Sequence, residues 1–290
     1  MERTVAGSHE RLRSFSTIAL VSAILALLAI VWSRPGSPQR PLTVWSTDAR
    51  SLITWRSGET QGVRSRAAGL PVALDVLEPN SIAIAVSNGD LWTTSSRFGG
   101  SQNRCSAVGV KWSASGLLLA VATTQQGLVS VSILDGNGVC VDWFATGITL
   151  GKNDKCTLSW NASDSMLLVG SAIRTEAYCT PEGLLAWSAS INRAYYISDD
   201  LIAANSGGDS VSVWRWSVQE DRIVRLRTIA YGWVLASNPT CEVAAVFVLN
   251  RIAVYLSGKI RVVDAFGRSA WVGGAVEAST DVVAALTCEY

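Results

Sequence analysis

A pattern that returns about every forty residues constrains the fold of this chain more than any other feature. Short apolar runs, each followed by a polar turn, begin at Ile82, Leu117, Met166, Leu201, Val243 and Val282. The intervals between them are 35, 49, 35, 42 and 39 residues, with a mean of 40. The runs alternate or are wholly apolar, and no amphipathic helix of useful length follows residue 42, so the repeat is built from strands.

Each repeat contains an apolar strand, a tight turn and an alternating strand. In "NSGGDSVSVWRW" (residues 205–216), Gly207 and Gly208 permit the positive φ of a turn, and valines then alternate with Ser212, Trp214 and Trp216. Asn88-Gly89 is a strong two-residue hairpin signal. A strand-only unit of roughly 40–45 residues is the length of a four-stranded propeller blade.

Three segments carry a family resemblance: "KWSASGLLLAVATT", "SWNASDSMLLVGSA" and "NSGGDSVSVWRW". They resemble the strand–turn–strand core of WD-repeat β-propellers, and the resemblance covers nearly all of residues 42–290. The family's Trp-Asp pair is absent, with Trp214-Arg215 the nearest match, and its Gly-His pair is missing too. The resemblance therefore implies a degenerate propeller without the family's histidine–aspartate network.

We expect an all-β propeller of six blades, or of seven if the 49-residue interval contains another. An open β-solenoid fits less well, because its coils would need shorter and more regular repeats. The last repeat ends at Tyr290 after what reads as its second strand. Residues 42–45 and 51–55 then read as the missing third and fourth strands, so that N- and C-terminal strands close the ring.

The N-terminal region predicts a membrane anchor. Residues 14–33 hold twenty residues without a charge, fifteen of them apolar. A helix of that length, at about 1.5 Å per residue, crosses a hydrocarbon core of about 30 Å. A cleaved signal peptide is the alternative, but no small-x-small site follows the apolar core. We expect a tail (1–13) in the cytoplasm, a transmembrane signal anchor (14–33), a Pro-rich linker (34–41) and the propeller (42–290) on the non-cytoplasmic side.

Composition excludes several classes of site. With 24 basic and 23 acidic residues, no net field recruits nucleic acid. The single histidine is His9, so the propeller region has no histidine for nucleophile activation or metal ligation. The six cysteines lack metal-ligand spacing, and they read equally well as buried apolar residues or as disulfides. No sequence motif indicates a catalytic residue, a metal or a cofactor.

We expect a non-catalytic scaffold or assembly subunit that binds other, membrane-associated proteins and contacts the bilayer through its N-terminal helix. Turns between second and third strands supply contact candidates, together with two tryptophans near polar loops: Gln125, Gln126, Arg174, Asp209, Arg251, Trp92 and Trp187. Reversing the charge of Arg174 and Arg251 is expected to weaken a partner without lowering the melting temperature. Trp112, Trp160 and Trp233 are expected to pack between blades.

The alternative function is a propeller enzyme of the hydrolase, lactonase or quinone-dependent dehydrogenase type. Such an enzyme would use carboxylates at the mouth of the central channel. Three or more carboxylates converging there would favour this alternative.

Overall fold

Strands make up the regular structure that can be described. The computed structural model describes residues 42–48, 51–56, 63–66, 71–78, 81–86, 90–93, 103–104, 106–151, 154–206, 208–249, 257–277 and 284–288. All of them belong to a compact unit formed by residues 41–290. No helix among these residues is long and apolar enough to cross a membrane. The tail, anchor and linker predicted for residues 1–41 lie outside the described residues.

Within the described ranges, 24 strands form six four-stranded antiparallel sheets. Sheet A consists of β24 (Ala284–Cys288), β1 (Leu42–Asp48), β2 (Ser51–Arg56) and β3 (Val63–Arg66). Sheet B consists of β4 (Pro71–Glu78), β5 (Ser81–Val86), β6 (Asp90–Thr93) and β7 (Asn103–Arg104). Sheet C consists of β8 (Ala107–Trp112), β9 (Leu119–Gln125), β10 (Leu128–Leu134) and β11 (Cys140–Thr149).

The other three sheets follow in chain order. Sheet D consists of β12 (Thr157–Trp160), β13 (Met166–Gly170), β14 (Thr175–Cys179) and β15 (Leu184–Ala189). Sheet E consists of β16 (Asn192–Tyr196), β17 (Leu201–Asn205), β18 (Ser210–Ser217) and β19 (Arg222–Tyr231). Sheet F consists of β20 (Trp233–Asn238), β21 (Val243–Leu249), β22 (Ser257–Asp264) and β23 (Ser269–Glu277).

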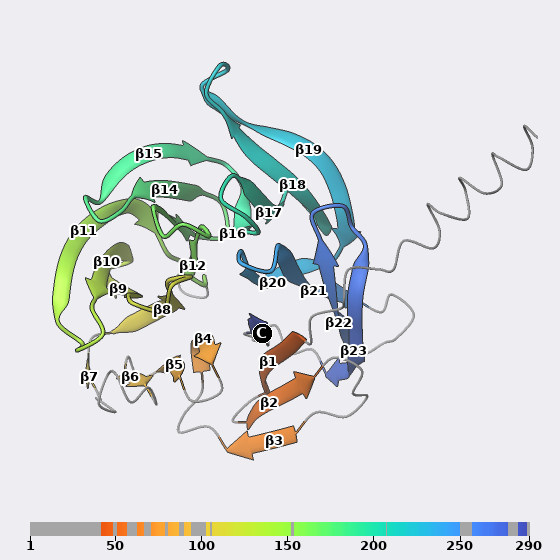
Figure 1. Ribbon diagram of the computed structural model, residues 1–290. Helices are drawn as coiled ribbons and strands as arrows, with labels where there is room; N and C mark the ends of the chain where they lie inside the picture. The colour runs from red at the N-terminus through yellow and green to blue at the C-terminus, as the bar shows by residue number, and fades with distance from the viewer. Residues whose placement is uncertain are drawn as a thin grey trace, which may run out of the picture. The chain divides into compact units, whose positions relative to one another are not determined.

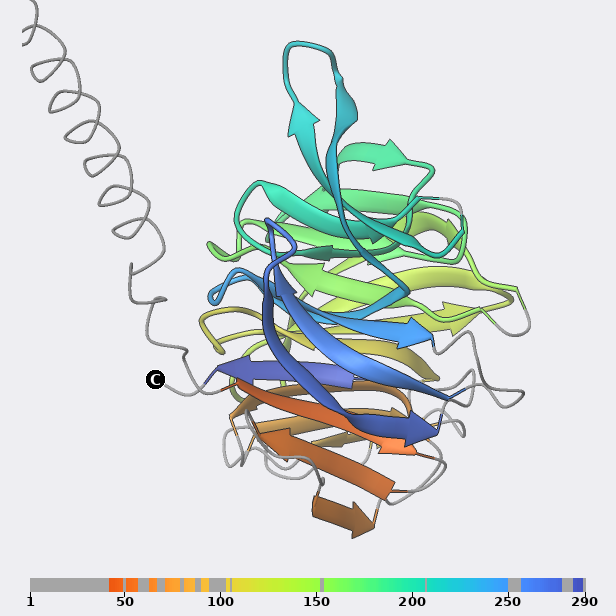
Figure 2. The same cartoon turned by 90° about the vertical axis from the view of Figure 1, so that its right-hand side faces the viewer.

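The sheets are arranged like the blades of a propeller. Their first strands contact one another in a closed cycle, β24–β4–β8–β12–β16–β20–β24. The other strands of each sheet lie progressively farther from the centre (Figure 1). Figure 2 shows these strands running between the two ends of the ring, with the β18–β19 hairpin projecting beyond its neighbours. The predicted all-β, propeller-like fold is therefore present.

Sheet A joins the two ends of the described chain. Strand β24 pairs antiparallel with β1, with Thr287 opposite Thr43. The C-terminal region contributes one strand and the N-terminal region three, whereas the sequence predicted two from each. The difference arises because an apolar first strand, buried on both faces, has the same sequence pattern as an apolar second strand.

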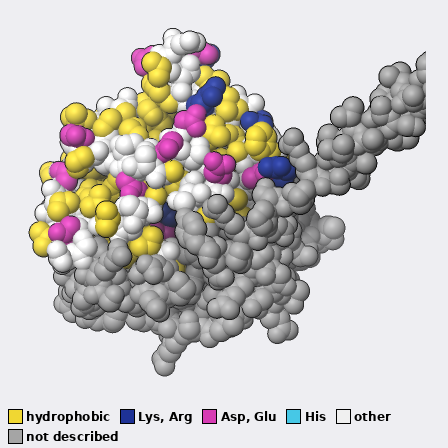
Figure 3. Space-filling view, in the orientation of Figure 1, with side chains coloured by type: hydrophobic (Ala, Val, Ile, Leu, Met, Phe, Trp, Pro, Cys, Tyr) yellow, Lys and Arg dark blue, Asp and Glu magenta, His cyan; other side chains and the backbone are white. Residues whose placement is uncertain are grey.

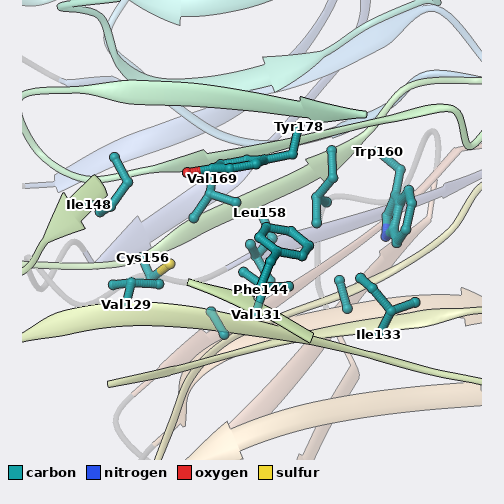
Figure 4. Close-up of a cluster of buried hydrophobic side chains, with 13 residues drawn as sticks. Val129, Val131, Ile133, Phe144, Ile148, Cys156, Leu158, Trp160, Val169 and Tyr178 are labelled. Carbon is teal, nitrogen blue, oxygen red and sulfur yellow. The ribbon is translucent and has the colours of Figure 1, made fainter. Parts of the chain in front are cut away.

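Large apolar side chains fill the space between neighbouring sheets. One cluster of described residues lies between sheets C and D and includes Ile133, Phe144, Leu158, Trp160 and Tyr178 (Figure 4). Each such side chain contributes roughly 1.5–3 kcal/mol when it leaves water. Trp160 is fully buried here, which confirms its predicted packing role.

The other two tryptophans of that group behave differently from each other. Trp112 is buried in a cluster that includes residues of sheets B and C, as predicted. Trp233 instead stacks on Phe247 of its own sheet, with ring centroids 6.1 Å apart, and it lies under the guanidinium of Arg193.

Two aspartates connect the loops that follow first strands in successive sheets. Asp164 accepts hydrogen bonds from the backbone N–H groups of Ala114 and Ser115, at 2.5 and 3.0 Å. Asp199 accepts one from Ser163 N at 2.7 Å. Each carboxylate thus holds the corresponding loop of the preceding sheet. These bonds show how neighbouring repeats are joined where the Gly-His and Trp-Asp pairs of the WD repeat are absent.

Candidate functional site

Five side chains of four kinds occupy one level of the innermost strands. Corresponding positions of five successive first strands hold Asp75, Lys111, Ser159, Tyr195 and Ser237. They are equivalent by register, because they pair with Ala83, Ala120, Leu168, Ala203 and Ala244, while the next residue of each first strand pairs with the residue just before that partner: Ile82, Leu119, Leu167, Ile202 and Val243. One ring position therefore carries an acid, a base, two hydroxyls and a phenol.

Asp75 and Lys111 form a largely buried ion pair at this level. Lys111 Nζ lies 2.8 Å from Asp75 Oδ1, and the side chains are 12% and 3% exposed. The other carboxylate oxygen, Oδ2, accepts a hydrogen bond from Trp112 N at 2.7 Å. Lys111 Nζ also donates to the carbonyl oxygen of Ser237 across the centre, at 3.4 Å. The ammonium therefore connects three of the six sheets.

A cavity of about 40 Å³ opens beside this pair, at the end of the ring where the first strands end. We call this end the channel mouth. Since one water requires roughly 10–15 Å³ on this measure, the cavity has room for about three waters. Its lining includes Asp75, Lys111, Trp160, Ser237 and Thr240. Trp160 Nε1 donates to the carbonyl oxygen of Lys111 at 3.1 Å and so fixes the backbone beneath the ammonium.

Ser237 is the unusual member of the lining. Its residue is fully buried, and its Oγ has no hydrogen-bond partner among the described residues. Buried hydroxyls in native proteins nearly always have a partner, so such an exception requires an explanation.

Tyr195 extends the polar level to sheet E. Burial raises the pKa of its phenol to about 12, Arg193 opposes the rise, and Cys156 and the negative charge of Asp75 add to it. The phenol is therefore neutral at physiological pH and adds no charge to this level.

The loops around the mouth are acidic. The four described loops that follow first strands cover residues 113–118, 161–165, 197–200 and 239–242. They contain Asp164, Asp199, Asp200 and Glu242 but no lysine or arginine. Loops after third strands lie at the same end, and Figure 3 shows acidic side chains spread over this view of the described part. The Asp75–Lys111 pair is neutral overall, and Arg215 of β18 lies 4.0 Å from Asp200 and offsets part of its charge. The other three loop carboxylates give this part of the mouth a negative potential.

The described residues contain no group of three histidine, cysteine, aspartate or glutamate side chains placed to hold a metal ion. Asp75 is the one carboxylate that lines the described cavity. Of the cysteines that the structure describes, Cys156 is a buried free thiol, Cys140 is exposed and Cys179 is partly buried, so the predicted burial holds for Cys156 alone among the free ones. Cys241 is disulfide-bonded, whereas Cys140, Cys156 and Cys179 are free.

The contact candidates predicted from sequence lie mainly at the end of the ring opposite the mouth. Gln125 and Gln126 belong to the β9–β10 turn, Arg174 to the β13–β14 turn and Asp209 to the β17–β18 turn. These turns contact segments that join neighbouring sheets: Gly232 N, for example, donates to Asp209 O at 2.6 Å. The predicted clustering of the two kinds of loop is therefore present, but the cavity is at the other end.

Arg174 is engaged by a buried carboxylate. Its guanidinium lies 2.8 Å from Glu176 Oε1, and Glu176 is 1% exposed. Glu176 Oε2 accepts hydrogen bonds from Gly147 N at 2.8 Å and from the Tyr178 hydroxyl at 2.5 Å. Burial, together with the hydrogen bond to Glu176, raises the pKa of the Tyr178 phenol. Charge reversal at Arg174 would place two carboxylates together, so at this position we expect the melting temperature to fall instead of staying unchanged.

The remaining candidates do not form an exposed aromatic platform in the described part. Trp187 is buried and stacks on Trp216 of sheet E, with ring centroids 5.5 Å apart and planes 6° from parallel. This corrects the expectation that Trp187 contacts a partner, because the long β18–β19 hairpin covers it. Trp92 lies in β6, but its side chain is outside the described residues, and Arg251 is outside them altogether.

A signal in the sequence could have located the inner level. Counting back six or seven residues from the markers Ile82, Leu117, Met166, Leu201 and Val243 reaches the five inner positions. A pattern of paired or clustered carboxylates does not mark these five positions, because the residue type changes in nearly every repeat.

Comparisons with known proteins support the fold. No family model matches the sequence, and no curated protein matches it. The crystal structure of TolB from Acinetobacter baumannii is similar with a TM-score of 0.58 at 11% identity, over 89% of this chain and 69% of TolB. A protein of unknown function from Bacteroides caccae also gives 0.58, at 10% identity, over 85% of this chain and 98% of its own. These likenesses show a propeller fold and do not show membership of the WD-repeat family.

Proposed function

We propose that this chain is a membrane-anchored, non-catalytic propeller that binds a basic segment of a partner protein at the channel mouth. The observation that carries the proposal is the set of four described loops around the mouth, which hold four acidic residues and no basic one. A cationic segment would be attracted to this rim, whereas anionic ligands would be repelled. The six sheets support a six-bladed ring, because their first strands already close a cycle.

The disulfide at Cys241 supports a non-cytoplasmic position for the propeller, because disulfides persist in oxidising compartments. The anchor at residues 14–33 and the cytoplasmic tail at residues 1–13 complete the proposed topology. Strand β1 begins at the mouth end, since Leu42 pairs with Cys288 at the end of β24. A linker that ends at residue 41 therefore joins the propeller at its proposed binding face.

Charge reversal at the mouth tests this function. The variant Asp200→Lys/Glu242→Lys changes two exposed rim residues. The matched control is Asp154→Lys, an exposed acid in the segment between β11 and β12, at the other end of the ring. Tagged full-length chains are purified in mild detergent from their own membranes, and bound proteins are compared by mass spectrometry.

We expect the rim variant to lose a partner that the wild type and the control retain, at an unchanged melting temperature. The same complex is expected to weaken with added salt, since exposed charges are screened beyond about 10 Å at 0.1 M. Equal recovery of every partner with the rim variant and with the wild type would refute a binding role for this face.

A further inference from the structure

Two hydrogen-bond donors at the channel mouth lack an acceptor in the described part of the chain. Lys111 Nζ carries three protons, and the described residues offer it two acceptors, Asp75 Oδ1 and Ser237 O. Ser237 Oγ has no partner there, although the residue is fully buried. Both residues line the same cavity. An ammonium proton and a hydroxyl proton are thus available to one guest group.

The charged acceptors of the site are already occupied. Asp75 Oδ1 binds Lys111, and Asp75 Oδ2 accepts from Trp112 N. A guest ammonium would have to share these oxygens with Lys111 and would lie beside its positive charge. The free donors therefore favour a guest that accepts hydrogen bonds.

Charge decides between the possible acceptors. A carboxylate or a phosphate would place a further negative charge beside the buried Asp75 and inside an acidic rim. A carbonyl oxygen of an amide adds no charge and satisfies both donors. The cavity of about 40 Å³, with room for about three waters, also matches the few heavy atoms of a peptide group.

We propose that the channel mouth is a carbonyl-binding site in which Lys111 Nζ and Ser237 Oγ donate to one amide oxygen. The proposal rests on the proposed function, since it names the group that a partner segment places in the mouth: a backbone carbonyl, with its basic side chains on the rim. Ser237 thereby obtains the partner that it lacks among the described residues.

The test uses the full-length chain in detergent and needs no partner. The chain has four lysines, so ¹⁵N-lysine labelling gives few ammonium signals, and Lys111→Met identifies the one of interest. N-methylacetamide is the amide probe, and acetate and inorganic phosphate are the anionic probes. A ¹⁹F-tryptophan label gives a second readout through Trp160, whose indole donates to the carbonyl of Lys111.

We expect N-methylacetamide to shift the Lys111 and Trp160 signals with a saturable dependence on concentration, and the anions to leave them in place. In Ser237→Ala the half-saturating concentration should rise several-fold while the melting temperature does not fall, because the removed hydroxyl has no partner to lose. Saturable shifts with acetate or phosphate, an equal amide response in Ser237→Ala, or no amide response would each overturn the proposal. Such a failure leaves the rim test of the proposed function intact, since that test depends on Asp200 and Glu242.

Discussion

The buried carboxylate of Glu176 makes stability depend on a residue at the surface. Arg174, whose side chain is 47% exposed, lies 2.8 Å from Glu176 Oε1. Replacing it by methionine keeps much of the aliphatic stem but removes the positive charge and one charge-assisted hydrogen bond. Gly147 N and the Tyr178 hydroxyl continue to donate to the other oxygen, Oε2. The substitution therefore leaves a buried carboxylate with two of its three partners, both on Oε2.

The expected cost follows from these contacts. A hydrogen bond to a charged group contributes about 1.5–3 kcal/mol. Because Arg174 is half exposed, solvent screens part of its charge, so the lower limit of about 1.5 kcal/mol applies to Arg174→Met. For a domain of this size, 1 kcal/mol corresponds to about 2–4 °C. We therefore expect the melting temperature to fall by about 3–6 °C.

Thermal unfolding of the full-length chain in detergent, followed by circular dichroism, measures this effect. Arg222→Met is the control, because Arg222 pairs with Glu220 while both side chains are exposed. Such surface pairs contribute roughly 0–1 kcal/mol. In the double variant Arg174→Met/Glu176→Gln, position 176 carries no charge, so most of the fall in melting temperature caused by the buried carboxylate should disappear. Equal melting temperatures for Arg174→Met and the Arg222 control would refute the reasoning.

Three further predictions concern packing and titration. Gly232→Ala should destabilise by about 3 kcal/mol, because the residue has φ +135° and an added Cβ would collide with the carbonyl of Phe247. Trp216→Ala should lower the free energy of unfolding by about 2 kcal/mol, because the stack on Trp187 is lost. This is less than the loss expected for replacing a fully buried tryptophan. Burial raises the pKa of the Cys156 thiol from 9.0 to about 12. The contribution of the neutral thiol to the free energy of unfolding is therefore complete below about pH 9 and is lost towards pH 12. Cys156→Ala should flatten the fall in melting temperature at alkaline pH.

Each of these predictions has a matched control. Gly208→Ala tests positive φ alone, since φ is +96° and nothing lies within 4 Å of the added Cβ. Trp143→Ala removes a tryptophan that is 59% exposed, and Cys140→Ala removes an exposed thiol. Scanning calorimetry at neutral pH, and a series of scans from pH 8 to about 11 for the cysteines, gives the comparison. Controls as damaging as their partners would show that the named contacts are not the cause.

The blade pattern was predictable because its physical basis is local. Apolar second strands such as β9 and β13 pair on both sides and pack on both faces, so they read as continuous apolar runs around Leu119 and Leu167. The assignment failed at β24, which has the same pattern but a different place in its sheet. Strand order depends on which strands pair in space, and the sequence of an apolar strand does not determine its partners.

The site was harder to predict, for a different reason. Arg174 and Asp209 were selected because polar residues at turns are usually exposed, but the contacts that engage them come from Glu176 and Trp233. The ring position that includes Asp75 and Lys111 could not be predicted as a site, because its chemistry depends on unlike residues from separate repeats. Asp75 and Lys111 are 36 residues apart, and the packing of sheet B against sheet C brings them together.

A hydrogen bond that recurs at this ring position shows how Ser237 differs from Asp75 and Ser159. Asp75 accepts a hydrogen bond from Trp112 N of the next first strand, and Ser159 accepts one from Tyr196 N in the same manner, at 2.9 Å. Ser237 has no such partner among the described residues, although Ser159 and Ser237 are both fully buried. The two serines occupy equivalent ring positions, but among the described residues only the Ser159 hydroxyl has a partner.

The same substitution should therefore have different effects at the two positions. Ser159→Ala leaves the buried Tyr196 N without its acceptor, which costs about 1–3 kcal/mol and lowers the melting temperature. Ser237→Ala removes a hydroxyl that has no partner, so the melting temperature should stay constant or rise. Differential scanning calorimetry of both variants in the same detergent provides the measurement. If Ser237→Ala destabilised the chain as much as Ser159→Ala does, the Ser237 hydroxyl would already be satisfied within the fold, and it could not be reserved for a guest carbonyl.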